Sequence, residues 1–475
     1  MQDLIKIFEN RTGEKVVNIS PLPQSGSYRK YYRITGKNKK AIGVFNDDKK
    51  ENIAFLSFTK HFLEQGLSVP EIYAEDPENN IYLIQDLGDI TLFSYIVENR
   101  KQAQFTDELI DIYKRVIEEL IKFQVPAGEK IDYSVCYPRA SFDQQSMLWD
   151  MSYFKYYFLK LAQIPFDEQN LEDDFHCFSD YLLQADRNYF LYRDFQSRNV
   201  MLYNNMPYFI DYQGGRKGAL QYDLASLLFD AKADIPQEVR TELLEHYINS
   251  INNITSINRT EFIEFFYGYV IIRIMQALGA YGFRGFYEKK EHFLKSIPYA
   301  IKNIEWILDS VSLPIELPTL MGVLKQITIS DRLKKFDVGK YTESAFKISI
   351  NSFSYRTGIP EDKSGNGGGF VFDCRANDNP GRYEQYQHLT GKDTEVIEFF
   401  SNNDEIGEFL NNIYLLVDQS VEKYKERNFT DLMVNFGCTG GQHRSVYCAE
   451  MLAWHLKGKY NIDIVLRHTE QEDLT

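Results

Sequence analysis

The sequence lacks an excess of basic residues, a cysteine pattern typical of disulfides or metal sites, and an apolar run that approaches membrane-spanning length. It carries 53 Lys and Arg against 68 Asp and Glu, a net charge of −15. This acidic balance argues against a general binder of nucleic acid or anionic membranes, because phosphate contacts need a basic surface. The five cysteines are odd in number and favour a reducing compartment. Since Met1–Leu4 shows no basic apolar leader, we expect a soluble cytoplasmic protein that does not bind membranes.

Length and composition predict more than one domain. A chain of 475 residues is longer than a single domain with one hydrophobic core usually is. Hydrophobic residues make up 44% and charged residues 25%, a balance typical of globular proteins. Pro314 and Pro318 interrupt a helical region, and the pattern changes again near Thr342. We therefore predict a first domain over 1–335, divided into two lobes near residue 88, and a second domain over 343–475.

The most informative stretch is Tyr192–Asn199. It places Asp194 at the end of an apolar run and Asn199 five positions later, and Asp211 follows two further apolar runs. Phosphoryl transfer uses such a set: one carboxylate near the acceptor hydroxyl, and a carboxamide and a carboxylate that hold metal against the triphosphate. Tyr192 stands where this kinase pattern usually has His. Because Asp and Asn between strands are also common turn formers, the neighbouring segments must decide between the two interpretations.

The segments before this stretch fit a nucleotide-binding lobe. A turn of small residues, Ser25–Tyr28, is expected between two extended segments. Backbone amides in such a turn can approach phosphate oxygens. An ordinary hairpin is the alternative. A predicted helix over 51–66 and a strand over 81–84 lead into a segment whose backbone would face adenine. The predicted nucleotide contacts are Ser25, Gly26, Ser27, Tyr28, Arg29, Gln85, Asp86 and Leu87.

The expected third strand, Lys40–Phe45, lacks a lysine where a kinase usually neutralises the phosphates. Gly43 and Val44 occupy the corresponding positions. Arg29 and Lys30 are the alternative cations.

Two helices are expected after the stretch Tyr192–Asn199, which is called the catalytic stretch below. Asp223 precedes an apolar run, and we interpret it as an N-cap that also braces the catalytic stretch. A helix over 261–278 is expected to end at the glycine-rich segment 279–285, which would act as a C-cap and shape one wall of the acceptor site.

Residues 1–335 resemble the aminoglycoside-phosphotransferase-like family, and most of all its cell-wall sugar kinases, which phosphorylate N-acetylmuramate and N-acetylglucosamine at the anomeric carbon. The resemblance rests on residues 25–33, 86–89, 193–199, 210–213, 222–226 and 276–279. It implies an α+β two-lobed protein-kinase-like domain, ATP and Mg²⁺ as cofactors, and a small sugar as substrate. It further implies that Asp194 is the general base and that Asn199 and Asp211 bind Mg²⁺. Strand lysines are also missing in the sugar-kinase branch.

The second half predicts a smaller α/β domain with a mostly parallel sheet. The expected strands cover 346–353, 370–372, 432–436 and 464–466, and the expected helices cover 393–401, 404–425 and 444–456. The glycine-rich loop 437–443 precedes a helix and can present backbone amides to an anion. Ligands of α/β sheets lie beyond the carboxyl ends of the strands. The predicted anion or phosphosugar site comprises Asp373, Arg375, Cys438, Thr439, Gly440, Gly441, His443, Arg444, Ser445, Arg467 and His468.

Cys438 and Arg444 also have the Cys-x5-Arg spacing of cysteine phosphatases. Gly437 replaces the His that customarily precedes that cysteine. We therefore favour a small residue in an anion-binding loop over a phosphatase nucleophile.

Residues 343–470 resemble the C-terminal domain of the RNase adaptor protein RapZ. The matching segments are 353–355, 358–360, 372–375, 389–391 and 437–447. The resemblance implies a domain that senses an amino-sugar phosphate and binds a regulatory RNA. The chain has no Walker loop, and its acidic ending, 469–475, repels phosphates, which argues against RNA binding.

The leading hypothesis is an ATP- and Mg²⁺-dependent sugar kinase that acts on a cell-wall amino sugar. Its C-terminal domain would bind a phosphosugar and either regulate the kinase or assemble a homo-oligomer. The alternative is a RapZ-like RNA-binding adaptor in which the kinase fold is a non-catalytic ligand-binding scaffold.

Overall fold

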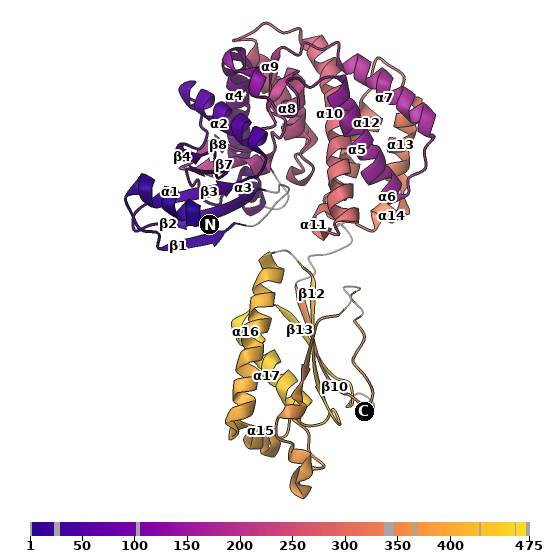
Figure 1. The fold of residues 1–475 in the computed structure, drawn as a ribbon. Coiled ribbons are helices and arrows are strands. Elements are labelled where there is room, and N and C mark those ends of the chain that lie inside the picture. Colours follow the sequence, from indigo (N-terminus) through magenta and orange to yellow (C-terminus); the bar gives the residue numbers. More distant parts are fainter. Residues whose placement is uncertain are drawn as a thin grey trace. The chain divides into compact units, whose positions relative to one another are not determined.

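The chain divides into two compact units, Met1–Asp337 and Val338–Thr475. The computed structural model describes residues 2–22, 29–100, 105–336, 346–362, 364, 368–426, 429–460 and 462–471 (Figure 1). The predicted phosphate-covering turn, Ser25–Tyr28, lies outside these residues. Each unit has its own hydrophobic core.

The first unit begins with a five-stranded antiparallel sheet of order β1-β2-β3-β5-β4. Its strands are β1 (Asn18–Pro21), β2 (Lys30–Thr35), β3 (Lys40–Phe45), β4 (Ile72–Asp76) and β5 (Ile81–Ile84). Successive side chains of a strand point to opposite faces of a sheet. Ala41 therefore packs with Leu4 and Phe8 of α1 (Gln2–Thr12), whereas Val44 packs with Phe55 of α2 (Lys49–Glu64). A helix thus covers each face of the sheet.

The remainder of the first unit is mainly helical. Its α-helices are α3 (Leu92–Asn99), α4 (Asp107–Lys122), α5 (Gln144–Phe154), α6 (Lys160–Ala162), α7 (Glu168–Leu182), α8 (Leu220–Leu228), α9 (Gln237–Ile251), α10 (Arg259–Tyr281), α11 (Glu291–Leu294), α12 (Ile297–Ser310), α13 (Pro318–Ile329) and α14 (Asp331–Lys334). Two short antiparallel ladders hold the catalytic stretch: β6 (Tyr189–Leu191) with β9 (Arg216–Gly218), and β7 (Val200–Tyr203) with β8 (Met206–Phe209). The stretch therefore lies between two strands that belong to different ladders.

Helix α10 runs through the middle of the helical lobe beside α5 and α12 (Figure 1). The expectation that no apolar run approaches membrane-spanning length is wrong for the stretch 259–287, which is long and apolar enough by length and composition. Neighbouring helices bury 72% of its apolar window. Its apolarity therefore follows from a central position in the core.

The prediction that this α-helix ends at the glycine-rich segment 279–285 is confirmed, with Gly282 as the C-cap residue, but the chain stays helical beyond it. The α-helix continues to Tyr281 and passes into a π-helical turn, Gly282–Tyr287. A Cβ atom on Gly282 would lie 2.0 Å from the carbonyl oxygen of Tyr157. The glycine is needed for close helix packing, because only a residue without a side chain fits against that backbone.

Replacing Gly282 with alanine is expected to destabilise the first unit by about 1–3 kcal/mol or more, because the added methyl group meets fixed backbone. Gly322→Ala in α13 is the matched control, since nothing lies within 4 Å of its added Cβ. That control should stabilise the helix by up to ~1 kcal/mol. Denaturant unfolding measures both variants, and equal midpoints would contradict the packing role of Gly282.

The second unit contains a four-stranded parallel sheet of order β11-β12-β10-β13. Its elements are β10 (Lys347–Ser354), β11 (Phe370–Asp373), α15 (Thr394–Ser401), α16 (Asp404–Glu426), β12 (Asp431–Cys438), α17 (Arg444–Lys459) and β13 (Asp463–His468). The central strands β10 and β12 are buried along most of their length, as is typical of parallel sheets. The fold class is confirmed: a kinase-like α+β unit is followed by a unit with a parallel sheet.

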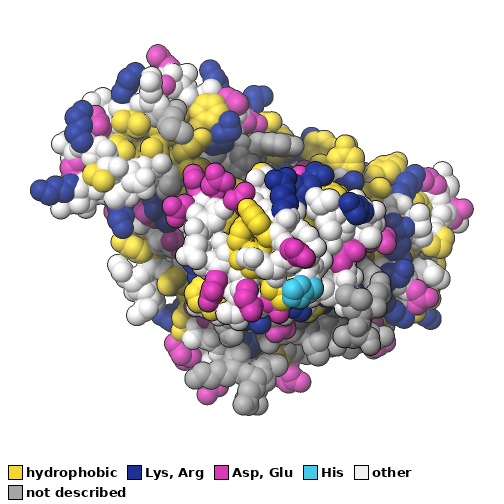
Figure 2. All heavy atoms as spheres, turned by 90° about the horizontal axis from the view of Figure 1, so that it is seen from below, with side chains coloured by type: hydrophobic (Ala, Val, Ile, Leu, Met, Phe, Trp, Pro, Cys, Tyr) yellow, Lys and Arg dark blue, Asp and Glu magenta, His cyan; other side chains and the backbone are white. Residues whose placement is uncertain are grey.

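The surface carries both signs of charge. On the face drawn in Figure 2, Asp and Glu side chains lie among the Lys and Arg side chains. This mixture agrees with the net acidic composition of the chain.

Candidate active site

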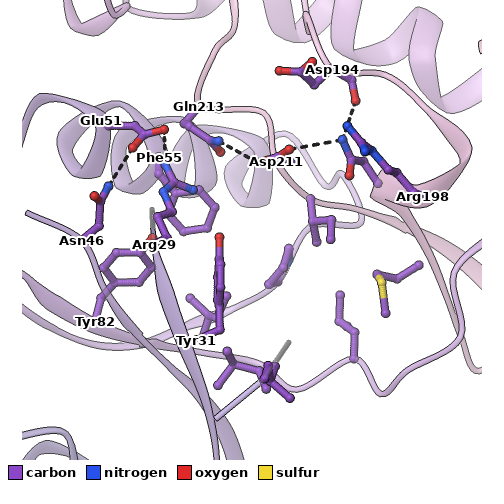
Figure 3. Close-up of a pocket in the computed structure, with 18 of the residues that line it drawn as sticks. Arg29, Tyr31, Asn46, Glu51, Phe55, Tyr82, Asp194, Arg198, Asp211 and Gln213 are labelled. Carbon is purple, nitrogen blue, oxygen red and sulfur yellow. Dashed lines mark hydrogen bonds and ion pairs between the residues drawn. The ribbon is translucent and has the colours of Figure 1, made fainter. Parts of the chain in front are cut away.

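Asp194, Asn199 and Asp211 line one cavity of about 950 Å³ in the first unit. The side-chain amide of Asn199 donates hydrogen bonds to the carbonyl oxygen of Asp194 at 2.8 Å and to Oδ2 of Asp211 at 3.2 Å (Figure 3). The fold thus brings together the three polar residues that the sequence separates by five and twelve positions.

Asp223 holds the start of the catalytic stretch. The N-cap interpretation is wrong, because Ala219 is the N-cap and Asp223 lies inside α8. Its fully buried carboxylate accepts hydrogen bonds from the backbone amides of Tyr192 at 2.7 Å and Arg193 at 3.0 Å. Burial raises the pKa of Asp223 to about 7, against the lowering effect of these two amides. Bracing the stretch is its structural role.

Two further carboxylates anchor the stretch, and no local sequence signal identified them. Arg193 donates to Oδ2 and Oδ1 of Asp150 at 2.8 and 2.6 Å, and Ser197 donates through its amide and hydroxyl to Asp230 at 3.2 and 2.5 Å. Arg193 and Asp211 have φ angles of +84° and +71°, which non-glycine residues seldom adopt. The anchors therefore stabilise a backbone conformation that is unfavourable by itself.

Tyr192 occupies the position where kinases usually have His. Its ring is fully buried, and its hydroxyl donates to the carbonyl of Ile210 at 2.6 Å. The ring also meets the edge of the Tyr212 ring, with centroids 5.9 Å apart. Tyr192 thus connects the catalytic stretch to the segment that carries Asp211.

The oxygen atoms around Asp211 fit a magnesium ion. Burial and the charge of Asp194 raise the pKa of Asp211. Gln213 donates from Nε2 to Oδ1 of Asp211 at 2.7 Å, and its buried Oε1 has no hydrogen-bond partner among the residues that the structure describes. Carboxylate and amide oxygens from Asn199, Asp211 and Gln213 are hard donors of the kind that Mg²⁺ prefers. The sequence prediction omitted Gln213, although it follows Asp211 by two positions.

The sheet side of the cavity carries an arginine in place of a strand lysine. Arg29 is only 2% exposed, and its Nη2 lies 3.0 Å from Oε1 of Glu51, the acidic residue in the first turn of α2. Lys30, the other candidate cation, lies over the ring of Phe45 at 5.7 Å. Arg29 lines the cavity together with Glu51, and Val44 is buried in the core.

The predicted linker residues Gln85, Asp86 and Leu87 also line the cavity. The carboxylate of Asp86 pairs with Nε of Arg33 at 2.8 Å, and the same guanidinium donates to Asp89 at 3.0 and 2.9 Å. The Asp86 side chain therefore attaches the linker to β2. The helical lobe contributes further lining residues: Tyr153, Arg198, Gln276, Ala280, Arg284 and Phe293.

The predicted anion site of the second unit lies at the carboxyl edge of the parallel sheet. Cys438 is buried; its Sγ accepts from the amide of Gly441 at 3.2 Å and lies 3.1 Å from Oγ of Ser445. Thr439 and Gly440 are exposed at the tip of the loop. The loop is thus folded around the thiol.

The arginines of this predicted site contact protein groups. Arg375 pairs with Asp373 at 2.7 Å. Arg444 is buried and donates to the carbonyl oxygens of Arg375 at 2.9 Å and Asn377 at 3.1 Å. Nη1 of Arg444 therefore holds the turn after β11, an arrangement that gives the phosphatase interpretation of Cys438 no support.

The histidines of the predicted site are also hydrogen-bonded within the unit. Nε2 of His443 lies 2.8 Å from the carbonyl oxygen of Tyr386. Nδ1 of His468 lies 2.8 Å from Oγ of Ser352, and its Nε2 lies 3.1 Å from Glu450. Arg467, next to His468, is exposed.

Glu470 also lies at this edge, and the sequence prediction omitted it. Its carboxylate accepts from the amide of Ser354 at 3.4 Å and from the hydroxyl of Thr357 at 2.5 Å. A Cβ atom on Gly441 would lie 2.2 Å from Cγ of Glu470, so this side chain packs directly on the glycine-rich loop.

An antiparallel lobe, a helical lobe and a cavity with an Asp–Asn–Asp set define the first unit as a kinase-like phosphotransferase. Residues 18–257, half of the chain, match the model of the phosphotransferase enzyme family, so the chain belongs to that family. Residues 346–472 match the model of the RapZ C-terminal domain, and the second unit is RapZ-like.

Curated relatives match part of the chain. A nucleotide-binding protein of Fervidobacterium nodosum is 38% identical over 130 residues, which are 27% of this chain and 44% of that protein. A nucleotide-binding protein of Bacillus cytotoxicus is 37% identical over 130 residues, 27% of this chain and 43% of that protein. The chain thus spans less than half the length of these relatives.

Solved structures of low sequence identity align with the chain. An ethanolamine kinase of Plasmodium vivax has a TM-score of 0.45 and 13% identity over 62% of this chain and 83% of that chain. A spectinomycin phosphotransferase, APH(9)-Ia, in complex with ADP and spectinomycin has a TM-score of 0.42 and 13% identity. The alignment covers 70% of this chain and 98% of that chain. A choline kinase of Cryptosporidium parvum has a TM-score of 0.44 and 13% identity. The alignment covers 68% of this chain and 99% of that chain.

Proposed function

We propose that the first unit is a Mg²⁺-dependent sugar kinase that phosphorylates a cell-wall amino sugar at its anomeric hydroxyl. The main support for phosphoryl transfer is that Asp194, Asn199 and Asp211 line one cavity. The sugar assignment is supported by the resemblance of the segments 193–199 and 210–213 to sugar kinases. The lining residues from the helical lobe support it too, because amide, guanidinium and aromatic groups suit an acceptor rich in hydroxyls.

Each residue of the site has a separate role in this proposal. Asp194 accepts the proton of the acceptor hydroxyl as that oxygen attacks the terminal phosphoryl group. Asn199 and Asp211 hold Mg²⁺, which neutralises charge on the phosphates when bound. The linker over 85–87 receives the adenine, and residues Ser25–Tyr28, which lie outside the described residues, are predicted to contact the phosphates.

A panel of sugars incubated with labelled ATP tests this proposal. N-acetylmuramate, N-acetylglucosamine and glucosamine come first, with choline and spectinomycin as acceptors of other classes. We expect label to transfer to at least one amino sugar and the product to be acid-labile at its anomeric position. Transfer only to choline or spectinomycin would overturn the sugar assignment.

The second unit, in this proposal, binds a phosphosugar at the carboxyl edge of its sheet and regulates the kinase. The amide-bearing loop over 437–443 next to the N-terminus of α17 supports an anionic ligand. The RNA-binding alternative is weakened by the net charge of −15 and by the mixed charges in Figure 2. Gel-shift titrations at several salt concentrations distinguish the two. Tight, strongly salt-dependent RNA binding without kinase activity would favour the adaptor.

Magnesium affinity is expected to weaken as the pH falls through the raised pKa of Asp211, by up to about tenfold per pH unit below that pKa. The reason is that burial and Asp194 raise the pKa of Asp211, so protons compete with the metal at a higher pH than for an ordinary carboxylate. Calorimetric titration of Mg²⁺ with a non-hydrolysable ATP analogue measures the effect. The slope should be smaller in Asp194→Asn, which removes one cause, and a pH-independent affinity would contradict the assignment of Asp211.

A further inference from the structure

Strand β3 offers no cation to the phosphates of a bound nucleotide. Kinases place a lysine on this strand and hold it with a glutamate from the helix behind the sheet. Here Val44 is fully buried among apolar side chains, on the same face of β3 as Ile42, which lines the cavity. The helix still supplies its glutamate, because Glu51 lies in the first turn of α2 and lines the same cavity.

Arg29 reaches this glutamate from the neighbouring strand. It directly precedes β2, where Tyr31 pairs with Val44 of β3. Its Nη2 lies 3.0 Å from Oε1 of Glu51. Its guanidinium carbon lies 5.8 Å from the centroid of the Phe55 ring. The cation is therefore displaced by one strand, while its acidic partner stays on the helix (Figure 3).

The pair is fixed from both sides. Asn46 donates from Nδ2 to Oε2 of Glu51 at 2.8 Å, which orients the carboxylate toward Arg29. Burial alone would lower the pKa of Arg29, but its interactions with Tyr82, Tyr31 and Glu51 outweigh burial and raise it. The guanidinium therefore keeps its charge in this buried place.

The charge of Arg29 extends to the metal-binding side of the cavity. Arg29 lowers the pKa of Asp211, so the guanidinium is within electrostatic reach of that carboxylate. Arg29 and Asp211 line the same cavity, so a phosphate group bound there can lie near both side chains. Unlike an ammonium group, a guanidinium offers a fork of donors that matches the oxygens of a phosphate.

We infer that Arg29 is the phosphate-neutralising cation of this kinase, moved from β3 to the start of β2, and that Glu51 is the positioning residue that holds it. This inference deepens the proposed function and rests on its nucleotide-binding half. It does not depend on which acceptor is used.

Nucleotide titrations without acceptor test the inference on the full chain. Arg29→Met should weaken ATP and ADP binding about 10- to 100-fold, because charged hydrogen bonds to the phosphates are lost. Adenosine lacks phosphates, and its binding should change by less than about twofold. Lys30→Met is the matched control: it removes the adjacent cation, which lies over Phe45, and should leave all three affinities unchanged.

Two further variants separate phosphate binding from a structural role. Arg29→Lys keeps the charge and should recover part of the ATP affinity, and Glu51→Gln should raise the KM for ATP while the KM for the acceptor stays constant. Unchanged ATP affinity in Arg29→Met overturns the inference. An equal loss of adenosine binding overturns it too, because it would show a collapsed pocket. Failure of every sugar as acceptor would leave these affinities measurable and would count against the sugar assignment alone.

Discussion

Asp194→Asn is expected to lower the turnover of sugar phosphorylation about 100- to 10,000-fold, the usual contribution of a general base. The KM for ATP should remain within about threefold, because the carboxylate faces the acceptor hydroxyl in the proposed mechanism. The loop itself should survive the change, since Asn199 bonds to the backbone carbonyl of Asp194 and not to its side chain. Steady-state kinetics with the best acceptor of the sugar panel provide the measurement.

The exposed Asp173 on α7 offers a matched control for Asp194→Asn. Asp173→Asn makes the same chemical change away from the cavity and should leave turnover unchanged. If Asp194→Asn retained normal turnover while Asp173→Asn behaved as expected, Asp194 would not be the base.

Asp223→Ala is expected to have the second large effect, on stability and activity together. The substitution leaves the buried amides of Tyr192 and Arg193 without their acceptor. Each unsatisfied donor costs about 1–3 kcal/mol, so the free energy of unfolding should fall by about 2–6 kcal/mol. Turnover should fall as well, because Asp194 directly follows Arg193.

Asp223→Asn separates the hydrogen bonds from the volume of the side chain. Its amide oxygen can accept from one backbone amide well, whereas its NH₂ group faces the other donor unfavourably. We therefore expect an intermediate loss of stability in denaturant unfolding. Wild-type stability in Asp223→Ala would show that the two amides are satisfied in another way.

Several elements could be predicted because their signal is local. The short apolar segments Lys40–Phe45 and Ile81–Ile84 predicted strands with the observed bounds, because both faces of the sheet are covered and successive residues of these strands are buried. In the second unit, strands that alternate with helices and a glycine-rich loop before a helix predicted a mostly parallel sheet with its ligand site at the carboxyl edge. Local patterns of this kind do not depend on distant partners.

Other features depend on segments that are far apart in the sequence. An Asp before an apolar run is an N-cap by local rules, but the carboxylate of Asp223 is used by amides about 30 positions earlier. Glycines after a helix suggest a C-cap, which Gly282 is, but that rule does not record that the backbone of Tyr157 also requires the absence of a side chain there. Local rules fail at such positions because the deciding partner comes from another element.

The amino-acid sequence by itself predicted the set Asp194, Asn199 and Asp211, because their spacing and flanking strands are local features. Only the tertiary structure decided which cation faces that set. Arg29, directly before β2, and Glu51, in the first turn of α2, are joined by an ion pair, and no periodicity within either segment records that contact. The cavity combines a motif that can be read along the chain with an ion pair that forms only when the sheet and the helix meet.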